Sequence, residues 1–168
     1  MLSGPLPDSV NFVEYIESGA PLRGFVPLSR FVRLCDLIES KEGDVEIELC
    51  FVQTHMGSVT AVGTARASVE LVCQYCLEHM SSRVLIDVNV RLVESDTELY
   101  ALAPSVDGIV VDIPRLSLTE LIEDDLILGL PMVPRHQTPC TEIIEGKGKD
   151  SRRPFADLSK LFFVKEGD

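Results

Sequence analysis

The chain has 168 residues, 45% hydrophobic and 25% charged, and its formal net charge of −12 disfavours broad binding to nucleic-acid phosphates. This length and balance are typical of one globular domain that can bury its own core. No apolar run approaches the ~20 residues of a membrane span, and the N-terminus does not resemble a signal peptide. We therefore expect a cytoplasmic protein, in which the five cysteines are thiols or metal ligands.

The first half of the chain predicts an arm, a helix and three strands. Residues 1–27 hold four prolines and three glycines, which predicts an extended arm over the surface. Residues 29–40 have the apolar spacing of an amphipathic helix that begins after Ser29. Apolar and polar residues then alternate through three segments joined by short connections, which predicts an antiparallel meander over residues 45–52, 59–72 and 82–93. Gly63, inside the second of these strands, indicates a bulge or the close approach of a neighbour.

The second half predicts one more strand, a second helix and a tail. Residues 108–113 predict a short strand, and a helix follows in which Ser117 and Glu120 form a capping box. We therefore expect an α+β fold, an antiparallel sheet of about four or more strands with two helices packed on one face. The predicted organisation is a single domain over residues 1–145, including the arm, and a basic flexible tail with a short amphipathic segment over residues 146–168.

The charge of the second half changes sign along the chain. Residues 94–145 hold eleven acidic residues against two arginines, whereas residues 146–165 hold six basic residues against two acidic ones. The acidic part suits a basic protein partner, although it is also explained by solubility alone. RNA contact is predicted for the basic tail, at Lys147, Lys149, Arg152 and Arg153.

Two cysteines in the stretch CQYCLEHM raise the possibility of a metal site. Cys73 and Cys76 end a strand, and His136 and Cys140 stand at H-x-x-x-C spacing in a proline-rich loop. Together they could bind one tetrahedral zinc ion. The alternative is two thiols that line a tight turn, with Leu77 and Met80 directed into the core. A redox dithiol is less favoured, because no long helix follows whose N-terminus would lower a thiol pKa.

The sequence does not favour catalysis. It contains neither a Gly-rich phosphate loop nor a nucleophile elbow, and no spacing pairs a histidine with a partner. The acidic run at residues 123–125 could bind a divalent cation, but such runs are typical of a solvated helix face. We expect no enzyme and no small-molecule substrate. Glu120, Glu123 and Asp124 are expected to be exposed and to bind a protein partner.

Three separated segments carry a resemblance to a known family. LVCQYCLE, LTELIEDDLILGLPMVPRH followed by Cys140, and RRPFADLSKL are similar, in this order, to segments of the YceD family of bacterial large ribosomal RNA subunit accumulation proteins. Tyr75 and Arg153 depart from the family pattern, which usually has Arg and Asn there. The resemblance adds Gln74 to the candidate partner-binding residues, and none of the three segments is a catalytic signature.

The resemblance implies a role in ribosome assembly. The expected function is that of a non-catalytic factor for processing or accumulation of large-subunit ribosomal RNA. Its expected partner is a precursor of the large ribosomal subunit, contacted through a ribosomal protein, ribosomal RNA or both. Two alternatives remain open at this point, an RNA-processing enzyme and a zinc- or redox-dependent regulatory module that uses the Cys-x-x-Cys pair.

Overall fold

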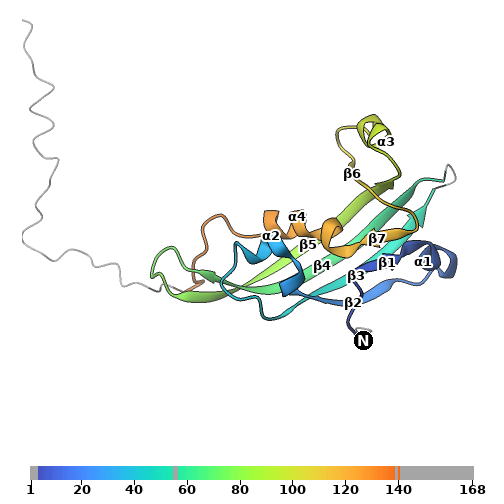
Figure 1. Cartoon of the computed structure of the whole chain (residues 1–168). Coiled ribbons are helices and arrows are strands. Elements are labelled where there is room, and N and C mark those ends of the chain that lie inside the picture. Colours follow the sequence, from blue (N-terminus) through green and yellow to red (C-terminus); the bar gives the residue numbers. More distant parts are fainter. Residues whose placement is uncertain (1–3, 55–56, 139, 141–168) are drawn as a thin grey trace, which may run out of the picture. The chain divides into compact units, whose positions relative to one another are not determined.

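The computed structural model describes residues 4–54, 57–138 and 140 (Figure 1). Within them, five strands form one sheet in the order β2-β3-β4-β5-β6, and two strands form a small second sheet, β1-β7. The elements in chain order are β1 (Ser9–Asn11), α1 (Phe12–Ser18), β2 (Leu22–Pro27), the 3-10 helix η1 (Leu28–Arg30), α2 (Val32–Cys35), β3 (Asp44–Gln53), β4 (Val59–Val72), β5 (His79–Val93), α3 (Asp96–Ala101), β6 (Asp107–Val110), β7 (Arg115–Ser117) and α4 (Leu118–Leu128).

The predicted α+β class is confirmed, and the predicted meander forms its centre. Strands β2 to β5 pair antiparallel in sequence order, with Leu49 opposite Gly63 and Ala65 opposite Ile86. The fourth predicted strand, however, pairs parallel to β5. A parallel pair requires a crossover connection, and α3, which lies between β5 and β6 in the chain, provides it.

The prediction of an extended N-terminal arm is wrong for the described residues up to Pro27. They form β1, α1 and β2, and Phe12, Leu22 and Val26 are buried. The Asn11 side chain accepts a hydrogen bond from the Val13 N–H and so caps α1, and Gly19 ends the helix in the left-handed conformation. Gly19, Pro21 and Pro27 lie at the ends of these short elements, whereas Gly24 lies inside β2.

The helix predicted over residues 29–40 is shorter than expected. It is divided into η1 and α2 at Phe31, whose backbone leaves the helical region at φ −89° and ψ 87°. Most of the predicted apolar stripe is buried, including Phe31 and Cys35, but Val32 is exposed. Phe31 gives α2 no side-chain cap, and the carboxylate of Glu123 in α4 accepts N–H groups at the start of α2 instead.

The core lies on one side of the long strands. Alternate residues of β3, β4 and β5 are buried, as the period of two predicted, and they share one cluster with buried side chains of α1, α2 and α4. Figure 1 shows α2 and α4 next to each other along the sheet. Residues Met1–Gln137 form a compact unit, and the predicted boundary at residue 145 remains a prediction. None of the helices in the described ranges is long and apolar enough to cross a membrane.

Replacing Gly63 by alanine is expected to destabilise the sheet by about 1–3 kcal/mol, the usual cost of overpacking. A Cβ atom at this position would lie 2.0 Å from the Glu48 carbonyl oxygen and 2.9 Å from Leu49 Cα, so the backbone of β3 would have to move. Urea unfolding of Gly63→Ala measures the loss. Thr64→Ala, at the exposed neighbouring position, is the control, and equal stability of the two variants would contradict the prediction.

Candidate metal centre

The connection between β4 and β5, residues 73–78, forms a tight turn that we call the knuckle. The Cys73 N–H donates to the Glu78 carbonyl oxygen at 2.9 Å, and the Leu77 N–H donates to the Cys73 carbonyl oxygen at 2.9 Å. The Tyr75 N–H points at the Cys73 sulfur, 3.5 Å away. A metal-bound thiolate at Cys73 would accept this N–H as a hydrogen bond.

The segment that follows α4, residues 129–137, lies against the knuckle, and we call it the proline loop. The Gln74 N–H donates to the Pro134 carbonyl oxygen at 2.8 Å. Cys76 Sγ lies 3.5 Å from His136 Nδ1. At the other end of the loop, a Cβ atom on Gly129 would lie 2.8 Å from Val84 Cγ1, so the end of α4 packs directly on β5. The loop is thus held at both ends.

The structure brings together the four side chains that were predicted to bind one metal ion. One sulfur or nitrogen atom from each of Cys73, Cys76, His136 and Cys140 lies within 4.8 Å of the others, so the set could hold a metal ion. Tetrahedral zinc with bonds of ~2.3 Å to sulfur and ~2.0 Å to nitrogen separates two sulfurs by about 3.8 Å and a sulfur from a nitrogen by about 3.5 Å. The observed distance of 3.5 Å between Cys76 Sγ and His136 Nδ1 is close to this sulfur–nitrogen separation.

Burial within the cluster decreases from one ligand to the next. Cys73 is fully buried, Cys76 and His136 are half-buried, and Cys140 is exposed. Three thiols and one imidazole form a common donor set for structural zinc, which uses all four ligands and leaves no open position for substrate. The alternative of two thiols at a tight turn placed both Leu77 and Met80 in the core. Met80 packs against the core, whereas Leu77 is exposed and has a backbone φ of 62°.

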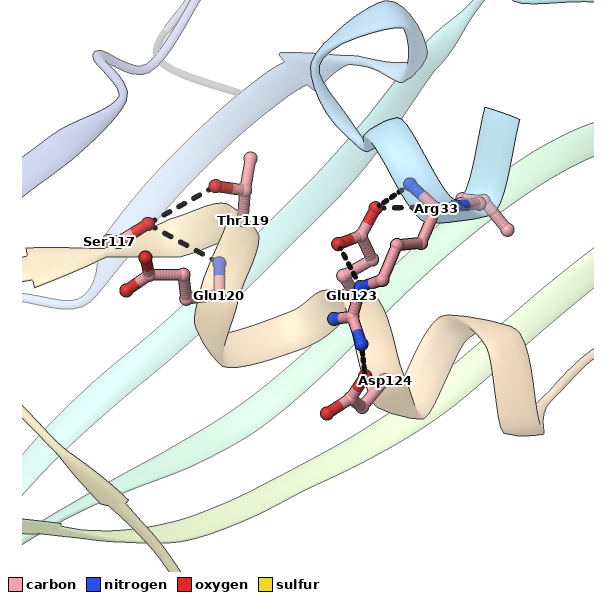
Figure 2. A network of polar contacts seen from close by, with 7 residues as sticks. Arg33, Ser117, Thr119, Glu120, Glu123 and Asp124 are labelled. Atoms are coloured by element: carbon pink, nitrogen blue, oxygen red, sulfur yellow. Dashed lines mark hydrogen bonds and ion pairs between the residues drawn. The ribbon is translucent and has the colours of Figure 1, made fainter. Parts of the chain in front are cut away.

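The acidic helix α4 differs from expectation at Glu123. This residue was predicted to be exposed, but it is only 7% exposed, and its carboxylate is directed at Arg33 of α2 (Figure 2). One carboxylate oxygen accepts the backbone N–H groups of Arg33 and Leu34 at 2.8 and 3.2 Å, and the other lies 3.0 Å from Arg33 Nε. Because α2 has no cap of its own, α4 supplies one through this carboxylate.

Arg33 links α2 to a second carboxylate of α4. Its guanidinium contacts Asp124 at 2.6 Å in addition to Glu123 (Figure 2). The hydrogen bond that Arg33 donates to Glu123, with smaller contributions from Asp124, raises the Arg33 pKa above its ordinary value. Asp124 remains exposed.

Glu120 and Gln74 are also exposed, and the Ser117 hydroxyl accepts the Glu120 backbone N–H at 3.3 Å. Partner binding by these three residues stays a prediction, and the predicted RNA-contacting residues lie outside the described part of the chain.

Replacing Asp125 by asparagine is expected to stabilise the protein at neutral pH but not in acid. Burial, together with the charges of Asp107 and Asp124, raises the pKa of Asp125 above its ordinary value of 3.8. The folded state therefore favours the protonated carboxyl, and stability is lost as the pH rises through the raised pKa. Unfolding free energies measured from pH 3 to 7 should diverge between wild type and variant as the pH rises. A constant difference across this range would refute the assignment.

These features define a class of protein, an α+β domain with a candidate Cys3His metal centre between a strand connection and a proline-rich loop. The chain belongs to the YceD family, because the model described as "Large ribosomal RNA subunit accumulation protein YceD" matches residues 61–162. The match spans all four candidate ligands, and it confirms the resemblance seen in the sequence.

A curated relative agrees with this assignment. The large ribosomal RNA subunit accumulation protein YceD of Haemophilus influenzae (strain ATCC 51907 / DSM 11121 / KW20 / Rd) is 23% identical over 140 residues, which cover 83% of this chain and 76% of that protein. No solved structure matches the chain.

Proposed function

We propose that this chain promotes the accumulation of large-subunit ribosomal RNA as a non-catalytic assembly factor that binds a precursor of the large ribosomal subunit. Family membership is the observation that carries the ribosomal RNA role. The charge of the chain supports the mode of binding, since residues 1–140 hold twenty-one acidic residues against nine basic ones. A basic ribosomal protein is the partner that such a surface suits best.

The proposed cofactor is one zinc ion, held by Cys73, Cys76, His136 and Cys140. The donor set and the separations within the cluster support it. When bound, the ion would supply cross-linking of two segments rather than chemistry on a substrate. The chain's own contribution is to direct the Tyr75 N–H at the Cys73 sulfur and to hold the proline loop against the knuckle through Gln74 and Pro134.

Sedimentation tests the proposed role. The purified full-length protein should co-sediment with large-subunit precursors at low salt, and the association should weaken at high salt because screening reduces attraction between opposite charges. Glu120→Gln combined with Asp124→Asn should weaken it further. Glu17→Gln combined with Glu42→Gln removes the same charge from other exposed positions and is the matched control. Absence of association at every salt concentration would refute the proposal.

The same preparations test the non-catalytic part of the proposal. Precursor RNA incubated with the protein and Mg²⁺ or Mn²⁺ should keep its length and its modification pattern. If the RNA is cleaved or modified, and Asp124→Asn with Asp125→Asn abolishes that change, the function is enzymatic and the acidic run is its site.

A further inference from the structure

We infer that the knuckle and the end of α4 with its proline loop form a docking surface for a basic protein segment that presents an apolar side chain. This inference rests on the proposed function and names its binding site. Five large apolar side chains are exposed on these two short stretches, namely Tyr75 (63%), Leu77 (73%), Leu128 (82%), Met132 (99%) and Val133 (60%). Exposed apolar side chains that gather on neighbouring segments are typical of interaction sites.

Contacts of the backbone and of the cluster join the two stretches. Gln74 and Pro134 are hydrogen-bonded, and each is next in sequence to one of the exposed residues, Tyr75 and Val133. Cys76 and His136 lie 3.5 Å apart. The apolar side chains of the knuckle and of the proline loop are therefore presented from adjacent backbones. A bound metal would fix this arrangement before the partner arrives, which lowers the entropic cost of binding.

Leu77 gives an independent indication of function. Its φ of 62° is a left-handed conformation that is costly for a leucine and free for a glycine. An exposed side chain gains no burial energy in return. Within the described residues, Leu77 is the one non-glycine residue with positive φ. A bulky residue kept in strained backbone at the surface is explained if its side chain contacts a partner.

The charge around the surface selects the partner class. Residues 73–78 and 118–137 together contain five carboxylates and one arginine, Arg135. Arg33 of α2 pairs with two of the five, Glu123 and Asp124, so the balance remains acidic. Asp124 stands one helical turn before Leu128, on the same face of α4. Such surroundings repel RNA phosphates and attract lysine and arginine side chains. We therefore assign the surface to a basic protein segment with an apolar anchor, and not to RNA or to a second copy of this acidic chain.

The test uses full-length, zinc-loaded protein, which is titrated by calorimetry with the individual proteins and with the ribosomal RNA purified from large ribosomal subunits. At least one basic protein should bind. Leu77→Gly should weaken this binding at least tenfold while the midpoint of thermal unfolding stays the same or rises, since the strain is relieved. Met132→Ser, at a fully exposed position, should also weaken binding. Leu85→Thr removes an equally exposed leucine from β5 and should bind like wild type.

The outcomes separate this inference from the proposed function. If a ribosomal protein binds wild type and both variants equally, the docking surface is refuted and the proposed function stands. If Leu85→Thr weakens binding as much as Leu77→Gly, the partner docks elsewhere and the assignment is also refuted. Binding of ribosomal RNA without any of the proteins would overturn the partner class. If no ribosomal protein binds the wild-type protein, the inference is refuted, and the co-sedimentation experiment decides the proposed function separately.

Discussion

Removing the metal with a chelator is expected to lower the midpoint of thermal unfolding by roughly 10 °C. A structural zinc site contributes its binding energy to folding, and we expect a loss of about 4 kcal/mol here because the chain also has a large apolar core. For a protein of this size 1 kcal/mol corresponds to roughly 2–4 °C. Calorimetry before and after chelation measures the change.

Cysteine variants make this prediction specific to the cluster. Cys73→Ser should unfold at about the same temperature as chelated wild type, and adding chelator to it should have no further effect. Cys50→Ser changes an exposed cysteine on β3 outside the cluster and should keep both the stability and the chelator response of wild type. A wild-type protein whose unfolding is unaffected by chelator would contradict the prediction, as would a chelator response that survives in Cys73→Ser.

Replacing Glu123 by alanine is expected to cost about 2–4 kcal/mol of unfolding free energy. The carboxylate accepts two backbone N–H groups at the start of α2, and hydrogen bonds to a charged group contribute roughly 1.5–3 kcal/mol each. The contact with the Arg33 side chain adds little, because that guanidinium is at the surface and screened by solvent. Glu123→Gln keeps one oxygen acceptor and should lose less than the alanine variant.

The control for this prediction lies one turn earlier on the same helix. Glu120 is exposed, and Glu120→Ala should change stability by no more than about 0.5 kcal/mol. Urea unfolding of the three variants gives the comparison. If Glu123→Ala and Glu120→Ala are equally stable, the carboxylate of Glu123 does not cap α2 and the sequence-based expectation of a solvated acid would be correct after all.

The long strands and α4 were predictable because their signals are local and repeated. Alternation over residues 45–51 and 84–92 specifies the buried face of β3 and β5 many times over. Ser117 marks the start of α4 in the sequence and caps it in the structure. The elements up to Pro27 were missed because strands of three and six residues and a helix of seven contain too few positions to establish a period. There the glycine and proline content outweighed the apolar pattern.

The four candidate ligands were predictable from spacing, whereas the state of Glu123 was not. A Cys-x-x-Cys turn and an H-x-x-x-C loop each position two ligands locally, so the fold had only to bring two segments together. The burial of Glu123 depends on backbone N–H groups about ninety positions earlier in the chain, and nothing near Glu123 in the sequence indicates them. The positive φ of Leu77 could not be predicted either, because leucine is rarely found in a left-handed conformation.

X-ray absorption at the zinc edge, on protein purified without chelator, tests the metal centre most directly. We predict one equivalent of zinc with three sulfur neighbours at about 2.3 Å and one nitrogen neighbour at about 2.0 Å. That result would make Cys73, Cys76, His136 and Cys140 a closed structural site and the knuckle and proline loop one rigid surface. Protein without zinc, or zinc surrounded only by nitrogen and oxygen, would contradict the account and leave the cysteines as thiols at a turn.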